Sequence, residues 1–444
     1  MSSLPWYIPP AFIGLGILSF IRIFRAMTFH CAATIRVRVP ILQNPLYNRG
    51  DCSVVVPVSD FNLKDDLNGS PLDQCIRSIL KNNVFALFLV TVDVQRRDHV
   101  NNYVSGLRIE YPDTQIHVGA VATTNKRSQI AHALPHVSTA ITILTDDDVT
   151  WPADFVTNAI APFSLNRLGA VGITKKIRKE VDPSTCQPFW SFLHSVYCEM
   201  QDTQVLNVNI LDRLRSGISS QTSLYRTDII RDSAFLEAFQ NEYSFFGRLG
   251  PIVDGYENFI VRWLIRNNWK ILIQDGEPIE IPPLNPLQFI QQCEYQHRIS
   301  MHFNAAMLCV PQIWNIKNVF TLFTKISDLL SSSLIFDTCL ILALIVLVSW
   351  NSWAWVCLML VAPAVLANKL VKPDQVVSRH PLDGIHIPSF VLFEYFQDLL
   401  KVKAIFTLYK LQHRGRQSND LEGGVERIDW TGGTIDEEMR NIPL

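Results

Sequence analysis

The sequence predicts an α/β protein in which a mostly parallel, doubly wound sheet is joined to membrane helices. Short apolar runs rich in β-branched residues occupy 52–59, 85–94, 115–122 and 140–145, and helical patterns such as 72–83 lie between them. Strands that alternate with helices are typical of a parallel sheet covered on both faces. Hydrophobic residues make up 48% of the chain and charged residues only 18%, against about 25% in globular proteins, and this deficit indicates membrane segments.

Residues 8–24 form an apolar run whose only charge is Arg22. Basic residues follow this run rather than precede it, which argues against a cleaved signal peptide. By the positive-inside rule the chain after the run lies in the cytoplasm. We therefore expect a transmembrane signal anchor in residues 1–30 and place residues 26–333 on the cytoplasmic side. A buried N-terminal helix of a soluble protein is the alternative.

The C-terminal part of the chain returns to membrane character at 334–370, which predicts a transmembrane hairpin. Lys369 and Lys372 follow it and again mark the cytoplasmic side. Residues 385–411 are apolar but carry acids and lysines, which favours an interfacial or re-entrant helix in contact with membrane lipid. The remaining segments are a linker at 31–49, a soluble α/β domain at 50–315, an interfacial connector at 316–333 and a polar, disordered tail at 412–444.

Composition also excludes some classes of function. The net charge is −2, so no basic excess indicates a nucleic-acid partner. Nine cysteines are scattered with no C-x-x-C pair, which argues against a zinc site or a disulfide framework. One glycosylation sequon begins at Asn68, and it matters only if that segment faces a lumen.

The stretch ITILTDDDVTWP places three carboxylates, Asp146–Asp148, directly after the buried run 140–145. Ligands bind doubly wound sheets beyond the carboxyl ends of the strands. A D-x-D pair there can hold a divalent cation through oxygen ligands, and the cation can bridge a nucleotide diphosphate. The alternative is a helix cap, because Thr150 and Pro152 are typical of a helix start, but a cap needs one acid rather than three.

Other polar residues follow the neighbouring strands. Asp60 and Asp93 lie at two strand ends that face the same edge, where they can accept hydrogen bonds from a base or ribose. Lys126 and Arg127 follow a third strand and can meet phosphate. Each alone is an ordinary surface residue, and together they describe a pocket for a nucleotide sugar.

These motifs resemble those of family 2 glycosyltransferases, and among them the fungal polysaccharide-synthase-like proteins related to hyaluronan, chitin and cellulose synthases. The resemblance covers most of residues 50–415. It rests on the order and spacing of several segments, including VVVPVSD, TTNKRSQIAHAL, TDDDVTWP, SGISSQTSLYRTDII and ENFIVRWLIRNNWKILIQ.

The resemblance implies a GT-A type catalytic domain at 50–315 and a UDP- or GDP-linked sugar donor. It implies that Mg²⁺ or Mn²⁺ lies between Asp146, Asp148 and the diphosphate. It further implies donor contacts by Asp60, Asp93, Lys126, Arg127 and Asp146, and an acceptor side shaped by the stretch that contains Ser216, Gly217, Tyr225 and Arg226.

Two motifs depart from the family pattern. The family's catalytic base is the second of two adjacent acids, but the matching segment DGYENF has Tyr256 in place of the first acid and Glu257 at the base position. Glu257 is the expected base and Asp254 a second candidate. The alternative is that Glu257 only starts a helix, where acids are favoured.

The second departure concerns the acceptor motif Q-x-x-R-W, whose Trp stacks on the acceptor sugar in processive members. The matching run begins at Gln292 and ends at Gln296, without the Arg or the Trp. Tyr295 supplies a possible stacking face one position early, and His297 or Arg298 a possible donor. The motif therefore favours a changed acceptor channel.

The expected function is a membrane-bound inverting glycosyltransferase of the plasma membrane or a secretory-pathway membrane, with its catalytic domain in the cytoplasm. Two hydroxyl acceptors stay open, a growing polysaccharide and a lipid or apolar small molecule. The rival hypothesis is a catalytically inactive relative that serves as a membrane scaffold or regulator.

Overall fold

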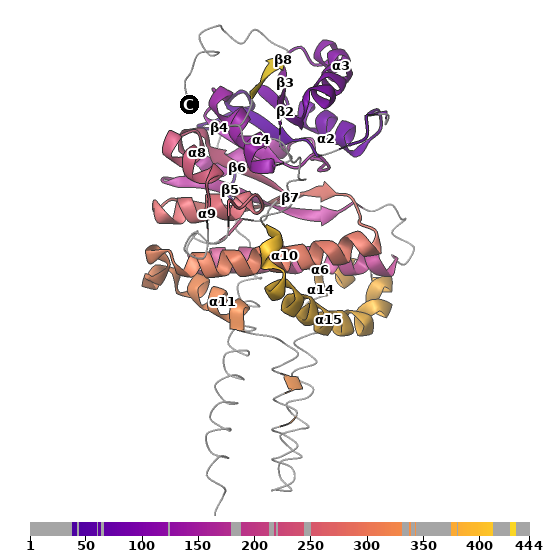
Figure 1. The fold of residues 1–444 in the computed structure, drawn as a ribbon, viewed down its shortest axis with the longest axis vertical. Helices are drawn as coiled ribbons and strands as arrows, with labels where there is room; N and C mark the ends of the chain where they lie inside the picture. The colour runs from indigo at the N-terminus through magenta and orange to yellow at the C-terminus, as the bar shows by residue number, and fades with distance from the viewer. Residues whose placement is uncertain are drawn as a thin grey trace, which may run out of the picture.

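The four predicted strands lie side by side at the centre of a sheet in the computed structural model (Figure 1). They are β1 (Cys52–Pro57), β2 (Ala86–Val92), β3 (Gln115–Val121) and β4 (Ile141–Thr145), in the order β4-β1-β2-β3. The structure describes residues 38–41, 44–59, 61–63, 66–122, 125–178, 188–212, 217–218, 221–243, 250–330, 337–338, 342, 374–379, 381–411 and 427–431.

The sheet has eight strands in the order β7-β5-β6-β4-β1-β2-β3-β8. The four added strands are β5 (Leu168–Ile177), β6 (Thr222–Arg226), β7 (Lys270–Ile281) and β8 (Arg427–Thr431). The central strands and the β5–β7 pair are parallel, whereas β6 runs antiparallel to β4 and β5, and β8 antiparallel to β3. The predicted mostly parallel sheet is therefore confirmed, with antiparallel strands at two places that sequence patterns did not assign.

Helices cover both faces of the sheet, as a doubly wound fold requires. Neighbouring residues of β1 point to opposite faces: Val54 packs in one core with Ile76 and Val100, and Val55 packs in the other with Ile130. The helices around these cores are α2 (Pro71–Leu80), α3 (Val94–Glu110), α4 (Lys126–Ala133), α5 (Phe155–Ile160), α7 (Thr227–Ile230), α8 (Ser233–Gln240) and α9 (Tyr256–Arg266).

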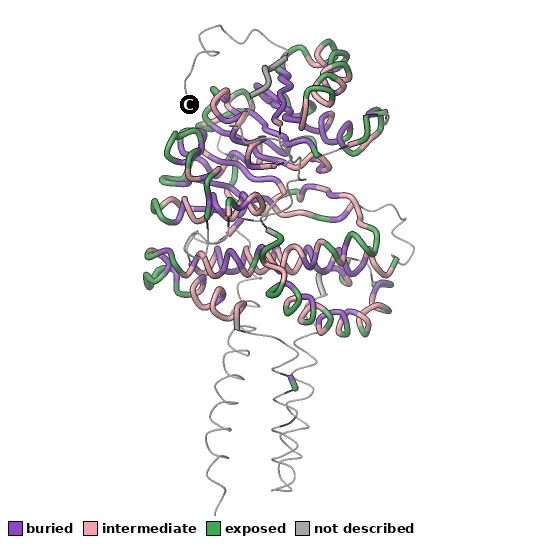
Figure 2. Tube along the Cα trace, in the orientation of Figure 1, coloured by how far each residue is buried: buried purple, intermediate pink, exposed green. Residues whose placement is uncertain are grey.

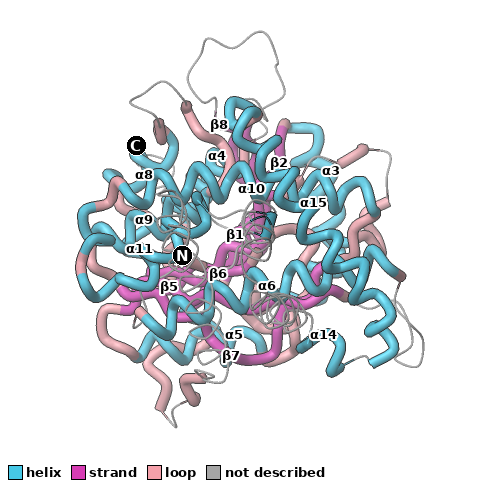
Figure 3. The backbone as a smooth tube through the Cα atoms, turned by 90° about the horizontal axis from the view of Figure 1, so that it is seen from below, coloured by secondary structure: helices cyan, strands magenta, loops and turns pink. Residues whose placement is uncertain are grey.

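A layer of longer helices lies below the sheet in Figure 1 and in front of it when seen from below in Figure 3. A third core, which includes Phe192, Phe289 and Phe393, joins most of the helices of this layer. The layer consists of α6 (Phe189–Leu211), α10 (Pro286–Leu308), α11 (Val319–Leu330), α14 (Asp374–Arg379) and α15 (Ile387–Phe406).

Burial follows this arrangement: the strands are buried and the outer turns of α3 and α15 are exposed (Figure 2). None of the helices that the structure describes is both long enough and apolar enough to cross a membrane. The predicted anchor at 1–30 lies outside the described residues, as does the predicted hairpin at 334–370 apart from residues 337–338 and 342.

The C-terminal tail departs from its prediction in one segment. The sequence predicts disorder throughout 412–444, but Arg427–Thr431 forms β8 and pairs with β3. The exposed edge of β3 offers unpaired backbone groups, and β8 satisfies them despite its polar composition. The predicted interfacial segment 385–411 does contain a helix, α15.

Candidate active site

The three acids predicted from the sequence, Asp146–Asp148, form a turn at the carboxyl end of β4. This turn is called the acid turn below. The backbone N–H of Asp146 donates to the carbonyl of Gln221, just before β6. Asp147 accepts hydrogen bonds from the backbone N–H of Ser59 at 2.6 Å and from its hydroxyl at 3.1 Å. Because Ser59 follows β1, the carboxyl ends of β1 and β4 meet at this turn, as the parallel pairing predicts.

Lys126 brings a positive charge to the acids. It is the first residue of α4, whose N-cap Asn125 accepts from the backbone N–H of Arg127. The Lys126 ammonium lies 2.6 Å from Asp146, and its side chain is 41% exposed. Burial opposes the charge on Lys126, but the carboxylate of Asp146 outweighs it and raises the pKa of Lys126. The structure thus joins two residues that the sequence assigned to the donor.

Asp148 keeps an uncompensated carboxylate. Burial, and then the charges of Asp146 and Asp147, raise its pKa to about 7. Such a group is stabilised by a cation, so the acid turn fits the divalent ion that the sequence predicts. Within the described residues no cluster of three or more His, Cys, Asp or Glu side chains is suited to a metal. A cation at Asp146 and Asp148 would therefore take its other ligands from a substrate or from water.

Glu257 lies near the start of α9, within electrostatic reach of the acid turn. The helix begins after Gly255, which is left-handed with φ +66° and acts as N-cap. A side chain at Gly255 would also crowd Ile299 of α10, because a Cβ would lie 3.3 Å from its Cγ2 atom. Burial, and then the charge of Asp146, raise the pKa of Glu257 to about 7. That value suits a general base at neutral pH.

Two tyrosines lie close to Glu257. Tyr225 is fully buried on β6, and its hydroxyl accepts from the Ser223 hydroxyl at 2.8 Å. Burial raises the pKa of both Tyr225 and Tyr256, and the charge of Glu257 adds to the rise for each. Both hydroxyls therefore stay protonated, and both are buried beside Glu257. The predicted acceptor role of Tyr225 stays a prediction.

Arg127 is buried instead of pointing at the acid turn. Its guanidinium is paired with Glu242 at 2.6 Å and donates to the backbone carbonyl of Asp254 at 2.9 Å. Sequence reasoning assigned no role to Glu242. These contacts direct the guanidinium toward the segment that carries Asp254 and Glu257. The predicted donor contact of Arg127 stays a prediction.

Asp93 lies at the predicted strand end, after β2, but its carboxylate is already engaged. It caps α3 by accepting from the backbone N–H of Arg96 at 2.8 Å, and the Arg96 guanidinium also pairs with it. The Asp93 side chain is 43% exposed. Its predicted contact with the nucleotide is untested. Asp60, predicted to bind the donor, and Ser216, predicted on the acceptor side, lie outside the described residues.

The predicted acceptor residues are spread over the fold. Arg226 pairs with Ile141 at the amino end of β4, opposite the acid turn, and bonds to the carbonyls of Leu168 and Phe163. The antiparallel direction of β6 thus carries Arg226 away from the acids, and its predicted acceptor role stays untested. Gly217 is described together with Ile218, and a Cβ at Gly217 would lie 3.7 Å from the Cγ1 atom of Val205.

Gln292 and Tyr295 lie on α10, which packs against the segment that starts α9. Tyr295 is near enough to Arg127 for its charge to affect the pKa of that arginine. The side-chain oxygen of Gln292 is buried, with no hydrogen-bond partner among the described residues. A buried, unsatisfied amide oxygen carries a free-energy cost that a hydroxyl ligand would remove. The predicted acceptor roles of Gln292 and Tyr295 stay predictions.

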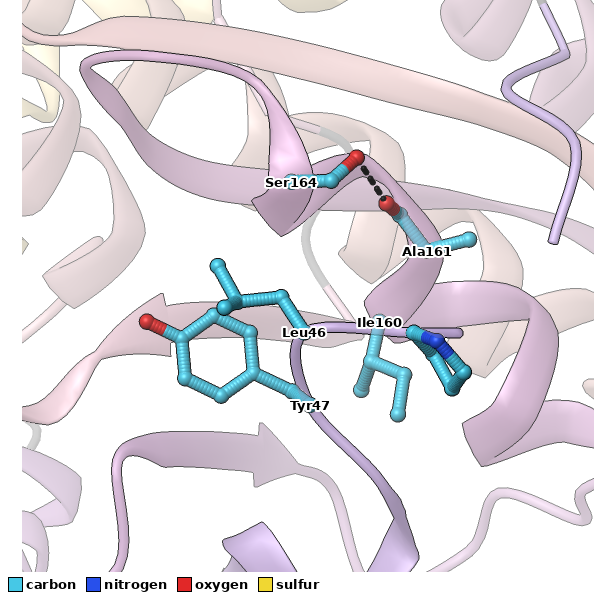
Figure 4. Close-up of a pocket in the computed structure, with 6 residues that line it drawn as sticks. Leu46, Tyr47, Ile160, Ala161 and Ser164 are labelled. Carbon is cyan, nitrogen blue, oxygen red and sulfur yellow. Dashed lines mark hydrogen bonds between the residues drawn. The ribbon is translucent and has the colours of Figure 1, made fainter. Parts of the chain in front are cut away.

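A small hollow elsewhere carries no comparable chemistry. It is shown in Figure 4 and is lined by Pro45, Leu46, Tyr47, Ile160, Ala161 and Ser164. The Ser164 hydroxyl there donates to the carbonyl of Ala161. Tyr47 accepts a hydrogen bond from Arg226, which places the hollow at the opposite end of the sheet from the acids.

Comparisons with known proteins agree with this geometry. Residues 63–279 match the family model for "Glycosyltransferase like family 2". The chain contains a family 2 glycosyltransferase domain. A "Type 2 glycosyltransferase" of Pyricularia oryzae is 29% identical over 434 residues, which are 94% of this chain and 84% of that protein. A protein of the same name from Gibberella zeae is 29% identical over 429 residues, 92% of this chain and 76% of that protein.

A solved structure shows that the family 2 domain and the helices below it share a known fold. The mannosyltransferase PcManGT from Pyrobaculum calidifontis, in complex with GDP-Man and Mn²⁺, superimposes with a TM-score of 0.50 at 13% identity. The similarity covers 90% of this chain and 96% of that chain. The predicted resemblance to family 2 glycosyltransferases is therefore confirmed, and so is the α/β fold class.

Proposed function

We propose that this family 2 glycosyltransferase is an inverting enzyme that moves a sugar from a nucleotide diphosphate to a hydroxyl acceptor. The observation that carries this proposal is Glu257, a partly buried carboxylate with a pKa of about 7, within electrostatic reach of Asp146 in the acid turn. A base and a diphosphate-binding group must lie on opposite sides of the transferred sugar for inversion, and in this proposal α9 supplies the base and the turn after β4 the diphosphate-binding group.

The reaction needs one proton transfer and one displacement. Glu257 accepts the proton of the acceptor hydroxyl as its oxygen bonds to the anomeric carbon of the donor sugar. The bond from that carbon to the diphosphate oxygen breaks, and the electron pair leaves with the nucleoside diphosphate. Attack from the side opposite the leaving group inverts the anomeric configuration.

Charge on the leaving diphosphate is the main electrostatic cost. Lys126, 2.6 Å from Asp146, supplies one positive charge at this edge. Asp146 and Asp148 would hold Mg²⁺ or Mn²⁺, which would neutralise the diphosphate. PcManGT was solved with Mn²⁺ and GDP-Man, which supports a divalent ion and a nucleotide-sugar donor here.

The acceptor is a growing polysaccharide or a lipid or apolar small molecule. In this proposal Tyr295 and Gln292 on α10 contact it. The missing Arg and Trp of the processive motif favour the small acceptor, whereas resemblance over the rest of the chain favours the polysaccharide. Product size separates the two.

Membrane attachment with the catalytic domain in the cytoplasm is part of the proposal. Leu392 is 71% exposed, Leu399 55% and Phe406 76%, so residues seven apart form an apolar stripe along α15. The neighbouring face, with Phe393 and Leu400 about 100° further round the helix, is buried. A helix of this kind is suited to the interface of a membrane. The test is flotation of the full chain with liposomes, before and after Leu392→Glu/Leu399→Glu.

The decisive experiment is a donor screen. Purified full-length protein is incubated with Mn²⁺ and radiolabelled UDP-glucose, UDP-N-acetylglucosamine or GDP-mannose, and release of free sugar is measured. We expect hydrolysis of at least one donor that is lost in Glu257→Gln and retained in Glu277→Gln, an exposed acid of β7. No hydrolysis and no binding of any donor would favour the rival hypothesis of an inactive scaffold.

A further inference from the structure

Arg127 makes contacts that no role at the donor explains. It is 1% exposed and is the largest fully buried side chain among the described residues. Its guanidinium donates to the backbone carbonyls of Phe239 at 3.1 Å and Asp254 at 2.9 Å. It also lies over the rings of Phe239 and Phe259, 5.4 and 5.5 Å from their centroids. Arg127 therefore joins α4, the end of α8 and the segment that leads into α9.

Glu242 completes the contacts on the other side. Its carboxylate lies 2.6 Å from Arg127 and also pairs with Arg262 of α9. Its backbone carbonyl accepts from Ile252 at 2.9 Å. Gly250 passes so close that a Cβ there would lie 2.8 Å from the Glu242 carbonyl. One residue thus fixes the approach to α9 through both its side chain and its backbone.

We propose that Arg127, Glu242 and Arg262, the Arg127 network, position the catalytic base Glu257 relative to the acid turn. The network acts through the backbone: Arg127 holds the carbonyl of Asp254, three residues before Glu257, and Arg262 lies five residues after it on the same helix. The inference rests on the proposed function, because it assigns a task to these residues in that reaction.

The connection to the acids runs through α4. Lys126 precedes Arg127 at the start of this helix and pairs with Asp146 at 2.6 Å. Two adjacent residues therefore bind the two halves of the site. Lys126 binds the acid turn, and Arg127 binds the segment that carries Asp254 and Glu257, called the base segment below. Asn125 caps this helix start, and such a cap stabilises it.

The charges agree with this task. One carboxylate serves two guanidiniums, and burial lowers the pKa of Arg127 to about 10 and of Arg262 to about 9. Both stay protonated at neutral pH, so the network has a surplus positive charge. The charges of Glu257 and Asp254 oppose the pKa decrease of Arg127. The surplus therefore faces the base segment and stabilises its carboxylates.

The test compares Arg127→Lys and Arg262→Lys with the control Arg108→Lys in full-length protein. Arg108 likewise donates to a backbone carbonyl, that of Ile116, at the amino end of β3. A lysine keeps the charge but loses the forked geometry. Hydrolysis of UDP-glucose, UDP-N-acetylglucosamine and GDP-mannose with Mn²⁺ gives kcat and KM, and hydrogen–deuterium exchange reports on residues 250–260.

For Arg127→Lys and Arg262→Lys we expect kcat to fall about 10- to 100-fold while donor KM stays within about twofold. The amide of Ile252 should exchange about tenfold faster or more. The Arg108→Lys control should match the wild type in both measurements. A rise of donor KM with unchanged kcat and exchange would show that Arg127 contacts the donor, and the proposal would be wrong.

Two further outcomes are also decisive. If kcat and exchange in the two variants match those of Arg108→Lys, the network positions nothing. If the wild type hydrolyses no donor, the proposed function fails. Hydrogen–deuterium exchange at residues 250–260 then tests the network separately, and exchange in Arg127→Lys and Arg262→Lys that equals the wild type would overturn it. Should Arg127→Lys not fold, the same two measurements on Arg262→Lys decide the proposal.

Discussion

Glu257 should set the pH dependence of sugar transfer, because a general base works only when it is deprotonated. Its pKa is about 7 rather than 4.5, owing first to burial and then to the charge of Asp146. About a tenth of such a group is deprotonated at pH 6 and about nine-tenths at pH 8. We therefore expect kcat to rise roughly tenfold over this range and to level off above it.

The stability of the protein should depend on pH in the opposite direction. Because the folded-state pKa of Glu257 is raised, folding favours its protonated form. The contribution of Glu257 to stability is present below its unfolded pKa of 4.5 and is lost as the pH rises through about 7. A change from 4.5 to about 7 corresponds to roughly 3 kcal/mol as an upper limit.

Glu257→Gln separates these two effects. It removes the base, so kcat should fall about 10²- to 10⁴-fold and lose its dependence on pH near 7. It also removes the buried charge, so thermal unfolding at pH 8 should shift to a higher temperature. The assay is single-turnover donor hydrolysis from pH 5.5 to pH 9, with calorimetry on the same samples and Glu277→Gln as the control.

Two results would refute this reasoning. Wild-type kcat in Glu257→Gln would exclude Glu257 as the base, and Asp254→Asn would then be the next variant. A flat profile between pH 6 and pH 8 in the wild type would show that the pKa is not raised in the donor complex. Neutralisation of Asp146 by a bound divalent ion would remove one cause of the shift, so the profile should move to lower pH as Mn²⁺ saturates.

Three other predictions follow from the same site and its surroundings. Asp146→Ala/Asp148→Ala should abolish turnover with the fold intact, and undiminished donor hydrolysis would exclude the acid turn as the metal site. Asn68 is exposed, so burial would not prevent its glycosylation. If the domain lies in the cytoplasm, Asn68 should nevertheless stay unmodified. A glycosidase-sensitive mass shift that is lost in Asn68→Gln would disprove that orientation. Products should be one to a few sugars long, and Tyr295→Arg/Gln296→Trp should lengthen them; polymers of many tens of sugars from the unaltered protein would contradict this.

The parts of the fold that depend on local pattern could be predicted from the sequence. The four central strands are continuous apolar runs, because a parallel strand is buried on both faces. The edge at which Asp146 and Asp93 lie then follows from the rule that ligands bind beyond the carboxyl ends of the strands, whereas the order of the strands does not, because doubly wound sheets occur with more than one order. The antiparallel strands β6 and β8 could not be predicted in this way, because their sequences are more polar than those of the central strands and their pairing depends on long-range contacts.

The direction of a strand decides the end of the sheet at which Arg226 lies. Ser216–Arg226 resembles an acceptor segment, and a resemblance gives position along the chain but not the end of the sheet at which each residue lies. Because β6 runs antiparallel to β4, its start pairs with Thr145 beside the acids and its end pairs with Ile141. Thr222 is therefore the residue of this strand nearest the acid turn, and its hydroxyl bonds to that of Thr145 at 2.7 Å.

Lys126 and Arg127 show what sequence alone could not separate. Both are cations after a strand, and the sequence assigned both to the phosphates of the donor. Successive residues of an α-helix point about 100° apart, so two adjacent side chains at a helix start cannot face one ligand equally. One of the pair must turn toward the protein interior, where a buried guanidinium needs a carboxylate and backbone carbonyls to offset its lost hydration. Glu242 supplies that carboxylate. It lies 115 residues after Arg127 in the sequence, so no local pattern could have identified it.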